Sequence, residues 1–372
     1  MSVVACFVGG WGHAEPLLPV ARLAEAHGHR VRFAGQAAVV PRLAAMGFET
    51  FVVGPDTLSA ERLPLVAVDR QAERAVVRDH FVGRYGAQRA EALGALFGRE
   101  RPSVVVCDEV DVGAVLAAEI HGIPCVTVTV LAAGRMAPGA VAVDVWNDVR
   151  VRHGLAPDPD GARLGGVLAL APSPRSFRDP SVLWPPVLQA VRPPILDQTT
   201  RSPAPFVYAT LGTVFNVESG DLLHRVARAL STLPVEALLT VGPTIDPGEL
   251  GDVGANVRIE QFVPQHEVLG RCAALVCHGG SGTLVAALSL GVPVVVLPMG
   301  ADQPDNADRC EALGVGLAVD PMVADAATIA DAASMVLSDD RYALAAGRLA
   351  VEAAAQTRLQ DVTELLALLE AH

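Results

Sequence analysis

The sequence lacks lysine altogether, so its 28 basic residues are all arginines, against 41 acidic residues. The formal net charge is −13 at pH 7, and no cluster of arginines interrupts this acidic balance. An acidic chain without a basic patch is a poor partner for nucleic acid or for an anionic membrane surface. The lysine of a P-loop is missing as well, so a bound phosphate group has to be held mainly by backbone dipoles and histidine.

Long apolar runs are also missing. Hydrophobic residues make up 51% of the chain and the mean hydropathy is +0.38, yet no run reaches the length of a membrane span. The surplus is alanine and valine in short segments, which is typical of buried parallel strands covered by helices. The N-terminus has no basic region followed by an apolar segment and a cleavage site, so we expect a cytoplasmic protein without an integral membrane segment.

Cysteines are few and scattered. No two of them form a C-x-x-C pair, so neither a zinc site nor a disulfide framework is indicated. Several stand in apolar stretches, where a thiol serves as a small buried hydrophobic group. The six are Cys6, Cys107, Cys125, Cys272, Cys277 and Cys310.

Strand-like and helix-like segments alternate in both halves of the chain, which predicts an α/β protein with doubly wound parallel sheets. Residues 56–98 are expected to be mostly helical, although their pattern is not clean. The strands expected in the first half are residues 3–8, 30–34, 49–53, 103–107 and 125–130, with helices at 15–27, 37–46 and 111–121. Those expected in the second half are 206–211, 235–241, 257–262, 274–277, 293–297 and 316–319, with helices between them and a helical tail from about residue 326.

Prolines separate the two halves. Residues 131–205 are irregular by pattern and rich in proline, and we place a linker at residues 192–205. A length of 372 residues also suggests two domains. The predicted organisation is two Rossmann-like domains that face each other across a cleft. Their ranges are residues 1–197 and 206–355, with residues 356–372 as a C-terminal helix that packs back towards the first domain.

The glycine-rich segment His278-Gly-Gly-Ser-Gly-Thr283 follows an apolar strand pattern and precedes a helical one. A strand that turns through glycines into a helix places unpaired backbone N–H groups and the positive end of the helix dipole in one space. Glycines also let a ligand approach the backbone closely. This junction therefore predicts a phosphate site, and the imidazole of His278 adds a donor to it.

A second polar segment, Asp302-Gln-Pro-Asp-Asn306, follows the next apolar strand. Asp302 and Gln303 fit a cap of the following helix, and an acceptor beside an amide also fits the hydroxyls of a sugar. Loops that follow parallel strands meet at one edge of the sheet. The two segments together point to a ligand with phosphates and many hydroxyls, such as a nucleotide sugar.

The segment Gly9-Gly-Trp-Gly-His13 lies between the first strand and the first helix. Only part of a dinucleotide fingerprint is present and no acid ends the second strand, so we disfavour an NAD site. Alone, His13 would be interpreted as a structural turn histidine. Asp108, however, directly follows the fourth strand, where a carboxylate behind the imidazole would fix its tautomer and raise its basicity. We favour this dyad over the rival carboxylates Glu109 and Asp111.

Three further segments have two interpretations each. Thr213 follows the first strand of the second half and could contact the same phosphates or simply form a turn. Phe262 ends another strand and could stack on a base or fill the core. Asp158-Pro-Asp160 has the D-x-D spacing of some divalent-metal sites, but it lies in a proline-rich loop with no strand before it, so we interpret it as a turn.

Taken together, these motifs resemble the nucleotide-sugar-dependent glycosyltransferases of the GT-B fold. Within that group they look closest to the bacterial branch that glycosylates polyketides, macrolides, enediynes and glycopeptides. The resemblance covers nearly the whole chain, but residues 56–98 and 131–146, where such enzymes shape the acceptor pocket, match nothing firmly. The motifs that carry it are Gly12-His13-x-x-Pro16, Arg101 to Asp108, Gly122-Ile-Pro124, Phe262-Val-Pro-Gln265, His278 to Thr283 and Asp302-Gln-x-x-Asn306-Ala307.

The resemblance implies an inverting sugar transfer that needs no metal or other cofactor. His13 would be the general base, oriented by Asp108, and the donor would be a nucleotide diphosphate sugar, usually thymidine-linked in this branch. Phe262 and the backbone of Val263 would bind the base, although family members often have Trp where Phe262 stands. The other implied donor-site residues are Thr213, His278, Gly280, Ser281, Gly282 and Thr283 for the diphosphate, and Asp302 and Gln303 for the sugar.

Two other functions stay open. One is a catalytically silent GT-B partner protein that activates another transferase, which we disfavour because His13, His278 and the Asp302-Gln pair are all intact. The other is a sugar-nucleotide epimerase of the same fold, which would act on the donor alone. The expected partners are a nucleotide-sugar donor and a small hydrophobic acceptor rather than nucleic acid or a membrane, and the chain could form a homodimer.

Overall fold

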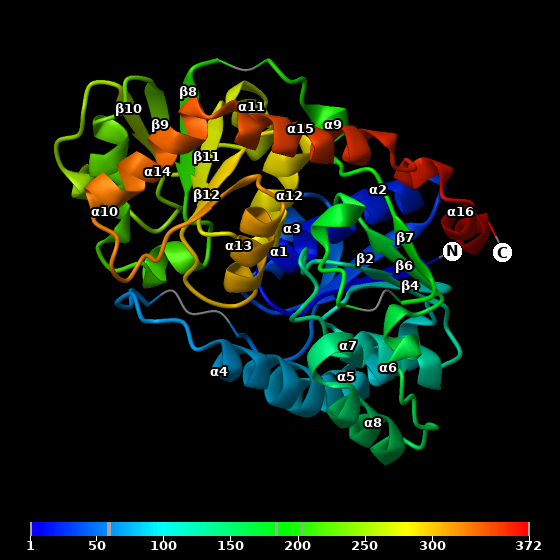
Figure 1. Ribbon diagram of the computed structural model, residues 1–372. Helices are drawn as coiled ribbons and strands as arrows, with labels where there is room; N and C mark the ends of the chain where they lie inside the picture. The colour runs from blue at the N-terminus through cyan, green and yellow to red at the C-terminus, as the bar shows by residue number, and fades with distance from the viewer. Residues whose placement is uncertain (1, 58–60, 183–184, 203, 371–372) are drawn as a thin grey trace.

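The computed structural model describes residues 2–57, 61–182, 185–202 and 204–370, which fold around two parallel sheets (Figure 1). The first sheet has seven strands in the order β3-β2-β1-β4-β5-β6-β7, and the second has six in the order β10-β9-β8-β11-β12-β13. In both sheets the chain winds outward in two directions from a central strand, as in Rossmann-like folds. The predicted GT-B class is therefore confirmed. Parts of the predicted helical segment 56–98, of the linker and of the C-terminal helix lie outside the described residues.

The first domain consists of the seven-stranded sheet and the helices around it. Its strands are β1 (Ser2–Cys6), β2 (Arg30–Gly35), β3 (Glu49–Val52), β4 (Val104–Asp108), β5 (Cys125–Val128), β6 (Leu168–Ala171) and β7 (Leu188–Ala190). Its helices are α1 (Trp11–Ala14), α2 (Leu18–Ala26), α3 (Val40–Ala45), α4 (Arg70–Ala75), the π-helix η2 (Val76–Tyr85), α5 (Gly86–Glu100), α6 (Val112–Ile120), α7 (Pro138–Val141) and α8 (Val143–Arg152).

The second domain follows the short helix α9 (Ile195–Gln198). Its strands are β8 (Phe206–Thr210), β9 (Glu236–Thr240), β10 (Val257–Glu260), β11 (Ala274–Cys277), β12 (Val294–Val296) and β13 (Gly316–Ala318). Its helices are α10 (Leu222–Ser231), α11 (Gln265–Val268), α12 (Ser281–Ser289), α13 (Gln303–Ala312), α14 (Ala326–Ser338) and α15 (Asp340–Ala355), and α16 (Thr363–Glu370) follows them.

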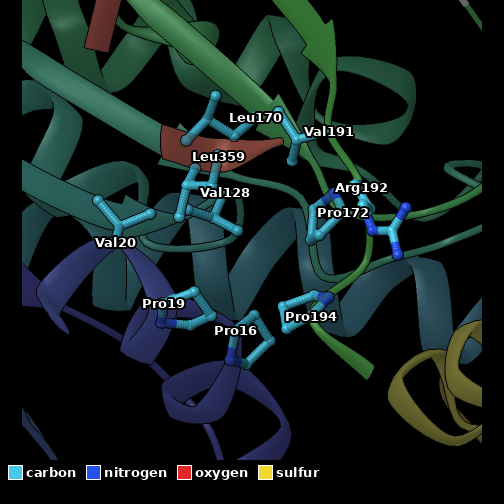
Figure 2. A pocket seen from close by; sticks show the side chains of 10 residues that line it. All are labelled: Pro16, Pro19, Val20, Val128, Leu170, Pro172, Val191, Arg192, Pro194 and Leu359. Carbon is cyan, nitrogen blue, oxygen red and sulfur yellow. The ribbon is translucent and has the colours of Figure 1, made fainter. Parts of the chain in front are cut away.

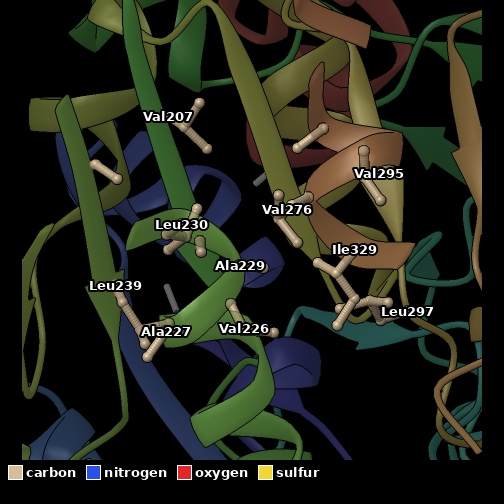
Figure 3. Close-up of a cluster of buried hydrophobic side chains, with 14 of the residues drawn as sticks. Val207, Val226, Ala227, Ala229, Leu230, Leu239, Val276, Val295, Leu297 and Ile329 are labelled. Carbon is tan, nitrogen blue, oxygen red and sulfur yellow. The ribbon is translucent and has the colours of Figure 1, made fainter. Parts of the chain in front are cut away.

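Strands β11 and β12 of the second sheet are fully buried, which explains their short and purely apolar sequences. Figure 3 shows the core on one face, where α10 and α14 cover the sheet. Leu230 from α10 and Ile329 from α14 pack there with Val207 and Val276 from the central strands. This packing fixes the carboxyl ends of the strands, and the loops that follow them start from a rigid base.

The chain returns to the first domain after α15. The N–H of Arg192 donates to the carbonyl of Thr357 (2.8 Å), which joins the returning segment to the edge of the first sheet. Helix α16 then buries Leu365 and Leu369 in the core of the first domain, and Nε2 of His29 donates to the carbonyl of Leu369 (2.8 Å). Figure 1 shows this helix beside the N-terminal elements, apart from the second sheet.

The structure corrects two of the predicted elements. The predicted helix 15–27 is instead the 3-10 turn Glu15–Leu17 followed by α2, because Pro16 and Pro19 remove backbone donors there, and the short helix α1 precedes it. The predicted irregular region 131–205 contains β6, β7, α7 and α8. Strand β6 has only four residues within a proline-rich stretch, so its apolar run is too short to identify a strand from pattern alone.

Two further features concern the apolar character of the helices and the state of the cysteines. Among the described residues, no helix combines the length and the apolar character that a membrane span requires. All six cysteines have free thiols and are buried in the cores of the two domains.

Candidate functional site

The loops at the carboxyl ends of both sheets contact each other. The N–H of Ala132, after β5, donates to Oγ of Ser281 (2.7 Å), and the N–H of Ala133 donates to Oδ1 of Asn306 (3.1 Å). Open α/β sheets bind ligands at this edge. The two domains therefore form the candidate site jointly, and the residues predicted from both halves of the sequence meet there.

His13 and Asp108 lie in direct contact. Nδ1 of the imidazole is 3.2 Å from Oδ1 of Asp108, whose side chain is fully buried, while 26% of the His13 side chain is exposed. The carboxylate also accepts the N–H groups of Val8 (2.9 Å) and Val110 (2.8 Å), which fix its position. A histidine held at Nδ1 by a carboxylate presents Nε2 to a ligand. The predicted dyad thus has the arrangement that a general base needs.

The turn before His13 depends on Gly9. This glycine has a φ of +96°, and a Cβ placed on it would lie 2.8 Å from Cδ2 of the imidazole. Both the left-handed backbone and the close ring exclude a side chain at this position. The glycine therefore lets the chain turn tightly enough to bring His13 back over the end of β4.

The pKa of His13 is raised. Burial by itself lowers it, but the charge and the hydrogen bond of Asp108 outweigh burial, and Asp302 and Glu109 raise it further. Asp302 belongs to the second domain, and the imidazole in turn lowers the pKa of that carboxyl against the larger effect of burial. Each of the two groups, one on each domain, therefore influences the protonation of the other.

The two carboxylates that rivalled Asp108 have other partners. Glu109 accepts the N–H groups of Val130 and Leu131, both at 2.7 Å, and so holds the loop that follows β5. Asp111 forms a buried ion pair with Arg89 and accepts the N–H of Ala114 at the start of α6. Of the three carboxylates, Asp108 is the one hydrogen-bonded to the imidazole.

The ring of His278 is enclosed at the start of the glycine-rich turn. A Cβ on Gly212 would lie 2.7 Å from its Nε2, and a Cβ on Gly280 would lie 2.4 Å from the same atom. Burial lowers the pKa of His278 to about 4, so the ring is neutral at physiological pH. Its Nδ1 is buried, and the backbone of Thr210 raises the pKa of the ring by less than burial lowers it.

Helix α12 begins directly after this turn, as the sequence predicts. Its N-cap residue is Gly280, so within the described structure no side chain caps the first N–H groups. A Cβ on Gly282 would meet open space, so the helix start is accessible. Thr283 is buried and its hydroxyl accepts a hydrogen bond from Gln265 (2.9 Å), whereas Thr213 is exposed on the loop after β8. These groups suit an anion at the helix N-terminus.

Asp302 is the N-cap residue of α13, but its side chain makes no capping hydrogen bond. Its carboxylate instead accepts hydrogen bonds from the side chains of Ser281 (2.6 Å) and Asn306 (2.8 Å), so of its two interpretations the side-chain cap is not the one realised. Gln303 is buried, and its Oε1 accepts the N–H of Met299 (2.8 Å), which shapes the loop after β12. Other side chains therefore set the orientation of the Asp302 carboxylate before any ligand binds.

Asn306 belongs to a motif noted in the sequence, but the sequence assigned it no role in the site. It is fully buried and donates to Gly279, Ser281 and Asp302 at 2.8, 3.1 and 2.8 Å, and it accepts the N–H of Ala133. The available signal was its spacing of four residues from Asp302 on one helix face. Asn306 joins the glycine-rich turn, the Asp302 segment and the first domain in one network.

Phe262 and Val263 follow β10, and Val263 packs against the core of the second domain whereas Phe262 lies near the first. The Phe262 ring is 54% exposed, and the guanidinium carbon of Arg42 in α3 lies 5.9 Å from its centroid. An exposed aromatic ring at a domain boundary is available for a flat ligand. Of the two interpretations of Phe262, core packing is therefore wrong.

The D-x-D segment has a structural role. Asp158 is buried and accepts hydrogen bonds from Nε1 of Trp146 (3.0 Å) and from the N–H groups of Ala162 and Arg163. This agrees with the predicted turn. In the part of the chain that the structure describes, no group of three or more His, Cys, Asp or Glu residues could hold a metal ion.

Two cavities lie near the domain boundary, and neither is lined by the predicted site residues. The first, about 20 Å³, lies beside α2 between Pro16, Val128 and Leu359 (Figure 2). The second, about 210 Å³, lies beneath Arg62, which forms two hydrogen bonds with Glu249 of the second domain at 2.6 and 2.9 Å. Sites for ligands of nucleotide size usually have about 300–1,000 Å³. Neither cavity is therefore a donor site.

Similar sequences match mainly the second domain. A family model described as "Erythromycin biosynthesis protein CIII-like, C-terminal domain" matches residues 225–369. The NDP-glycosyltransferase YjiC of Bacillus licheniformis is 33% identical over 146 residues, which span 39% of this chain but only 36% of that protein. The L-demethylnoviosyl transferase of Streptomyces niveus is 29% identical over 377 residues, which cover 99% of this chain and 98% of that one.

Solved structures match both domains. The spinosyn rhamnosyltransferase SpnG is 25% identical to this chain, and the match covers 98% of this chain and 100% of that one. The TM-score is 0.77 for its complex with spinosyn aglycone and 0.76 for its complex with thymidine diphosphate.

Proposed function

We propose that this chain, whose residues 225–369 belong to the erythromycin biosynthesis protein CIII-like C-terminal domain family, is a glycosyltransferase. It moves a deoxysugar from a nucleoside diphosphate donor, thymidine-linked, to a hydroxyl of a small apolar natural product, with inversion and without a metal. The observation that carries this proposal is that the His13–Asp108 pair and the glycine-rich turn stand at two sheet edges whose loops are hydrogen-bonded to each other. A base on one domain thus faces a phosphate and sugar site on the other.

The first domain supplies the proton acceptor. A hydroxyl is a poor nucleophile at neutral pH, and a positioned base removes its proton as it reacts. Nε2 of His13 takes this proton, and Asp108, hydrogen-bonded to Nδ1, stabilises the imidazolium that forms. The acceptor oxygen bonds to the anomeric carbon as the bond from that carbon to the diphosphate oxygen breaks. A single displacement of this kind inverts the configuration at the anomeric carbon, through a transition state like that of glycosidases.

The second domain supplies the leaving-group site. The diphosphate departs with the bonding electrons, and the uncapped N–H groups at the start of α12 stabilise its charge. His278 contributes as a neutral N–H donor because its pKa is about 4. The carboxylate of Asp302, oriented by Ser281 and Asn306, accepts hydrogen bonds from hydroxyls of the sugar.

The relatives support the choice of substrates. SpnG binds thymidine diphosphate and a spinosyn aglycone, and the Streptomyces niveus relative is named for transfer of a noviose-type sugar. The acceptor side of the site is expected from residues 56–98 and 131–146, the regions whose sequences match the family's motifs least. The sequence of those regions sets which aglycone is accepted.

The experiment is a mass-spectrometric screen of the full chain against a panel of nucleotide sugars and a panel of polycyclic and macrolide aglycones, with and without a chelator. A glycoside that forms from a thymidine-linked deoxysugar, equally with and without chelator, supports the proposal. Loss of turnover in chelator would overturn the metal-free mechanism. Conversion of the donor without any acceptor would identify an epimerase instead.

A further inference from the structure

Three side chains form a column that crosses from the first domain to the second. The guanidinium carbon of Arg42, in α3, lies 3.5 Å from the ring centroid of Trp11 at the start of α1. The same carbon lies 5.9 Å from the ring centroid of Phe262, which follows β10. Arg42 is thus within cation–π distance of an aromatic ring on each side of the domain boundary.

Trp11 and Glu15 lie beside Arg42 on the first domain. Trp11 and the charge of Arg42 both lower the pKa of Glu15 against the larger effect of burial. Arg42, Trp11 and Glu15 therefore form one unit at the end of the first sheet. Phe262, in contrast, stands alone on the second domain with more than half of its surface exposed.

We propose that Arg42 is a donor-binding residue that stacks on the nucleobase from the side opposite Phe262. This inference rests on the proposed function, since it assumes a nucleoside diphosphate at Phe262. The flat guanidinium, supported from behind by Trp11, is the kind of surface on which bases stack. The base is thereby held between one residue of each domain.

The distance between Arg42 and Phe262 implies that the two side chains move apart when the donor binds. A base needs about 3.5–4 Å to each flat neighbour, so a full sandwich needs roughly twice that distance. The 5.9 Å between Arg42 and Phe262 is less than this, so donor binding displaces the guanidinium by a small movement of the side chain or the domains. Donor binding then replaces the direct Arg42–Phe262 contact with one through the base.

A second stacking surface also compensates for the small ring of Phe262. Phe262 stands where the family often has Trp, and its smaller ring provides less stacking area. Arg42 compensates from the other domain, and its positive charge lies near the donor in a chain that has no lysine. Arg42 therefore affects the affinity for the nucleoside diphosphate without affecting the chemical step.

The test is calorimetry of the full chain with thymidine diphosphate, and with inorganic pyrophosphate as a probe that lacks the base. We expect Arg42→Gln to weaken thymidine diphosphate binding about 3–30-fold and to leave pyrophosphate binding unchanged. Arg42→Lys keeps the charge but not the plane and should recover little of the loss. In kinetics, the KM for the donor should rise by the same factor while kcat stays within about twofold.

The matched control is Arg22→Gln. Arg22 lies on α2, where its guanidinium carbon is 4.2 Å from the ring of Phe48, away from the site. It should leave both ligands unaffected. Thymidine diphosphate affinity in Arg42→Gln equal to that of the unaltered chain would overturn this inference alone, as would equal weakening of pyrophosphate. If the unaltered chain binds no nucleoside diphosphate, the proposed function fails and this inference fails with it.

Discussion

The imidazole of His13 has one nitrogen bound to a buried carboxylate and an exposed edge that faces the second domain. We expect His13→Ala to lower kcat about 10²–10⁴-fold, which is the usual contribution of a positioned base. The affinity for nucleoside diphosphate should stay nearly the same, because that ligand binds the other domain. Steady-state kinetics and calorimetry on the same variant check both expectations, and full activity would leave His13 as a structural turn residue.

The raised pKa of His13 also predicts a pH profile. A base acts only when deprotonated, so kcat should fall as the pH drops through the raised pKa of His13. Asp108→Asn removes the charge that raises this pKa. We expect its acidic limb to move to lower pH while its maximum rate falls. A pH–rate profile whose acidic limb stays in place in Asp108→Asn would contradict the dyad.

Substitutions of His278 and Asp302 should weaken the binding of different parts of the donor. His278→Ala removes a hydrogen-bond donor to a charged group, so we expect about 10–100-fold weaker binding of free nucleoside diphosphate. Because the pKa of His278 is about 4, this loss should be the same at pH 6 and pH 8. Asp302→Ala should raise the KM for the sugar donor and leave the free nucleoside diphosphate nearly unaffected. Equal weakening of both ligands in Asp302→Ala would reverse our assignment of the two loops.

How far the site could be predicted depends on the kind of contact. The sequence placed His13 and Asp108 at one sheet edge because the ends of parallel strands fix where their loops begin. It did not reveal that Ser281 and Asn306 hold Asp302, because those contacts join three separate loops and depend on how the two domains meet. The roles of these residues in binding and catalysis remain predictions, and the substitutions test them.

At the scale of elements, the loop after β5 connects the two half-sites. Glu109 accepts two N–H groups near the start of this loop. The next two N–H groups of the loop donate to Ser281 and Asn306. The adjacent carboxylates Asp108 and Glu109 at the end of β4 thus have different tasks. One positions the imidazole, and the other positions the loop that reaches the donor side.

Asn306→Ala tests this connection. It would remove the hydrogen-bond partner of the Gly279 carbonyl and of the Ala133 N–H, and one of the two side-chain donors to Asp302. We expect the free energy of unfolding to fall by about 1–3 kcal/mol, measured by urea denaturation. The control Arg228→Ala, at an exposed position of α10, should change it by less than about 0.5 kcal/mol. An equal effect of the two substitutions would show that the network adds no stability.

Element prediction succeeded where apolar runs alternate with clear helices and failed where prolines interrupt them. β11 and β12 were evident because continuous apolar runs are followed by glycine or proline. β6 and β7 lie in the proline-rich region 131–205, and their strand character comes from pairing with β5 and with each other. Such tertiary pairing has no local sequence signal, so this region was interpreted as irregular.

At the scale of the whole molecule, the fold predicted from the motifs is confirmed by the two parallel sheets and by the solved structures that this chain matches, which are glycosyltransferases of the predicted kind. The alternation of strands and helices was sufficient for this, since it admits few topologies. The contacts of residues 61–74 with the second domain could not be predicted. They depend on single ion pairs, such as Arg70 with Asp308 at 2.6 Å, in a segment without periodicity.

The packing of α16 predicts that a residue near the end of the sequence stabilises the first domain. Leu365 is fully buried there, and we expect Leu365→Ala to lower the free energy of unfolding by about 2–5 kcal/mol. Leu344→Ala is the control, because that side chain on α15 is 66% exposed. Urea denaturation gives the magnitude, and hydrogen exchange of β1 and β4 shows where it acts. Faster exchange in the second sheet instead would contradict this packing.

The same helix has a consequence for how the protein is made. Strands β1 to β4 leave the ribosome early, but the apolar face that Leu365 and Leu369 cover stays open until the chain has been synthesised that far. At about 5–20 residues per second, this delay is on the order of ten to fifty seconds. The second domain receives its last covering helix, α15, before then. The domain whose synthesis begins first is thus the one whose folding is completed last.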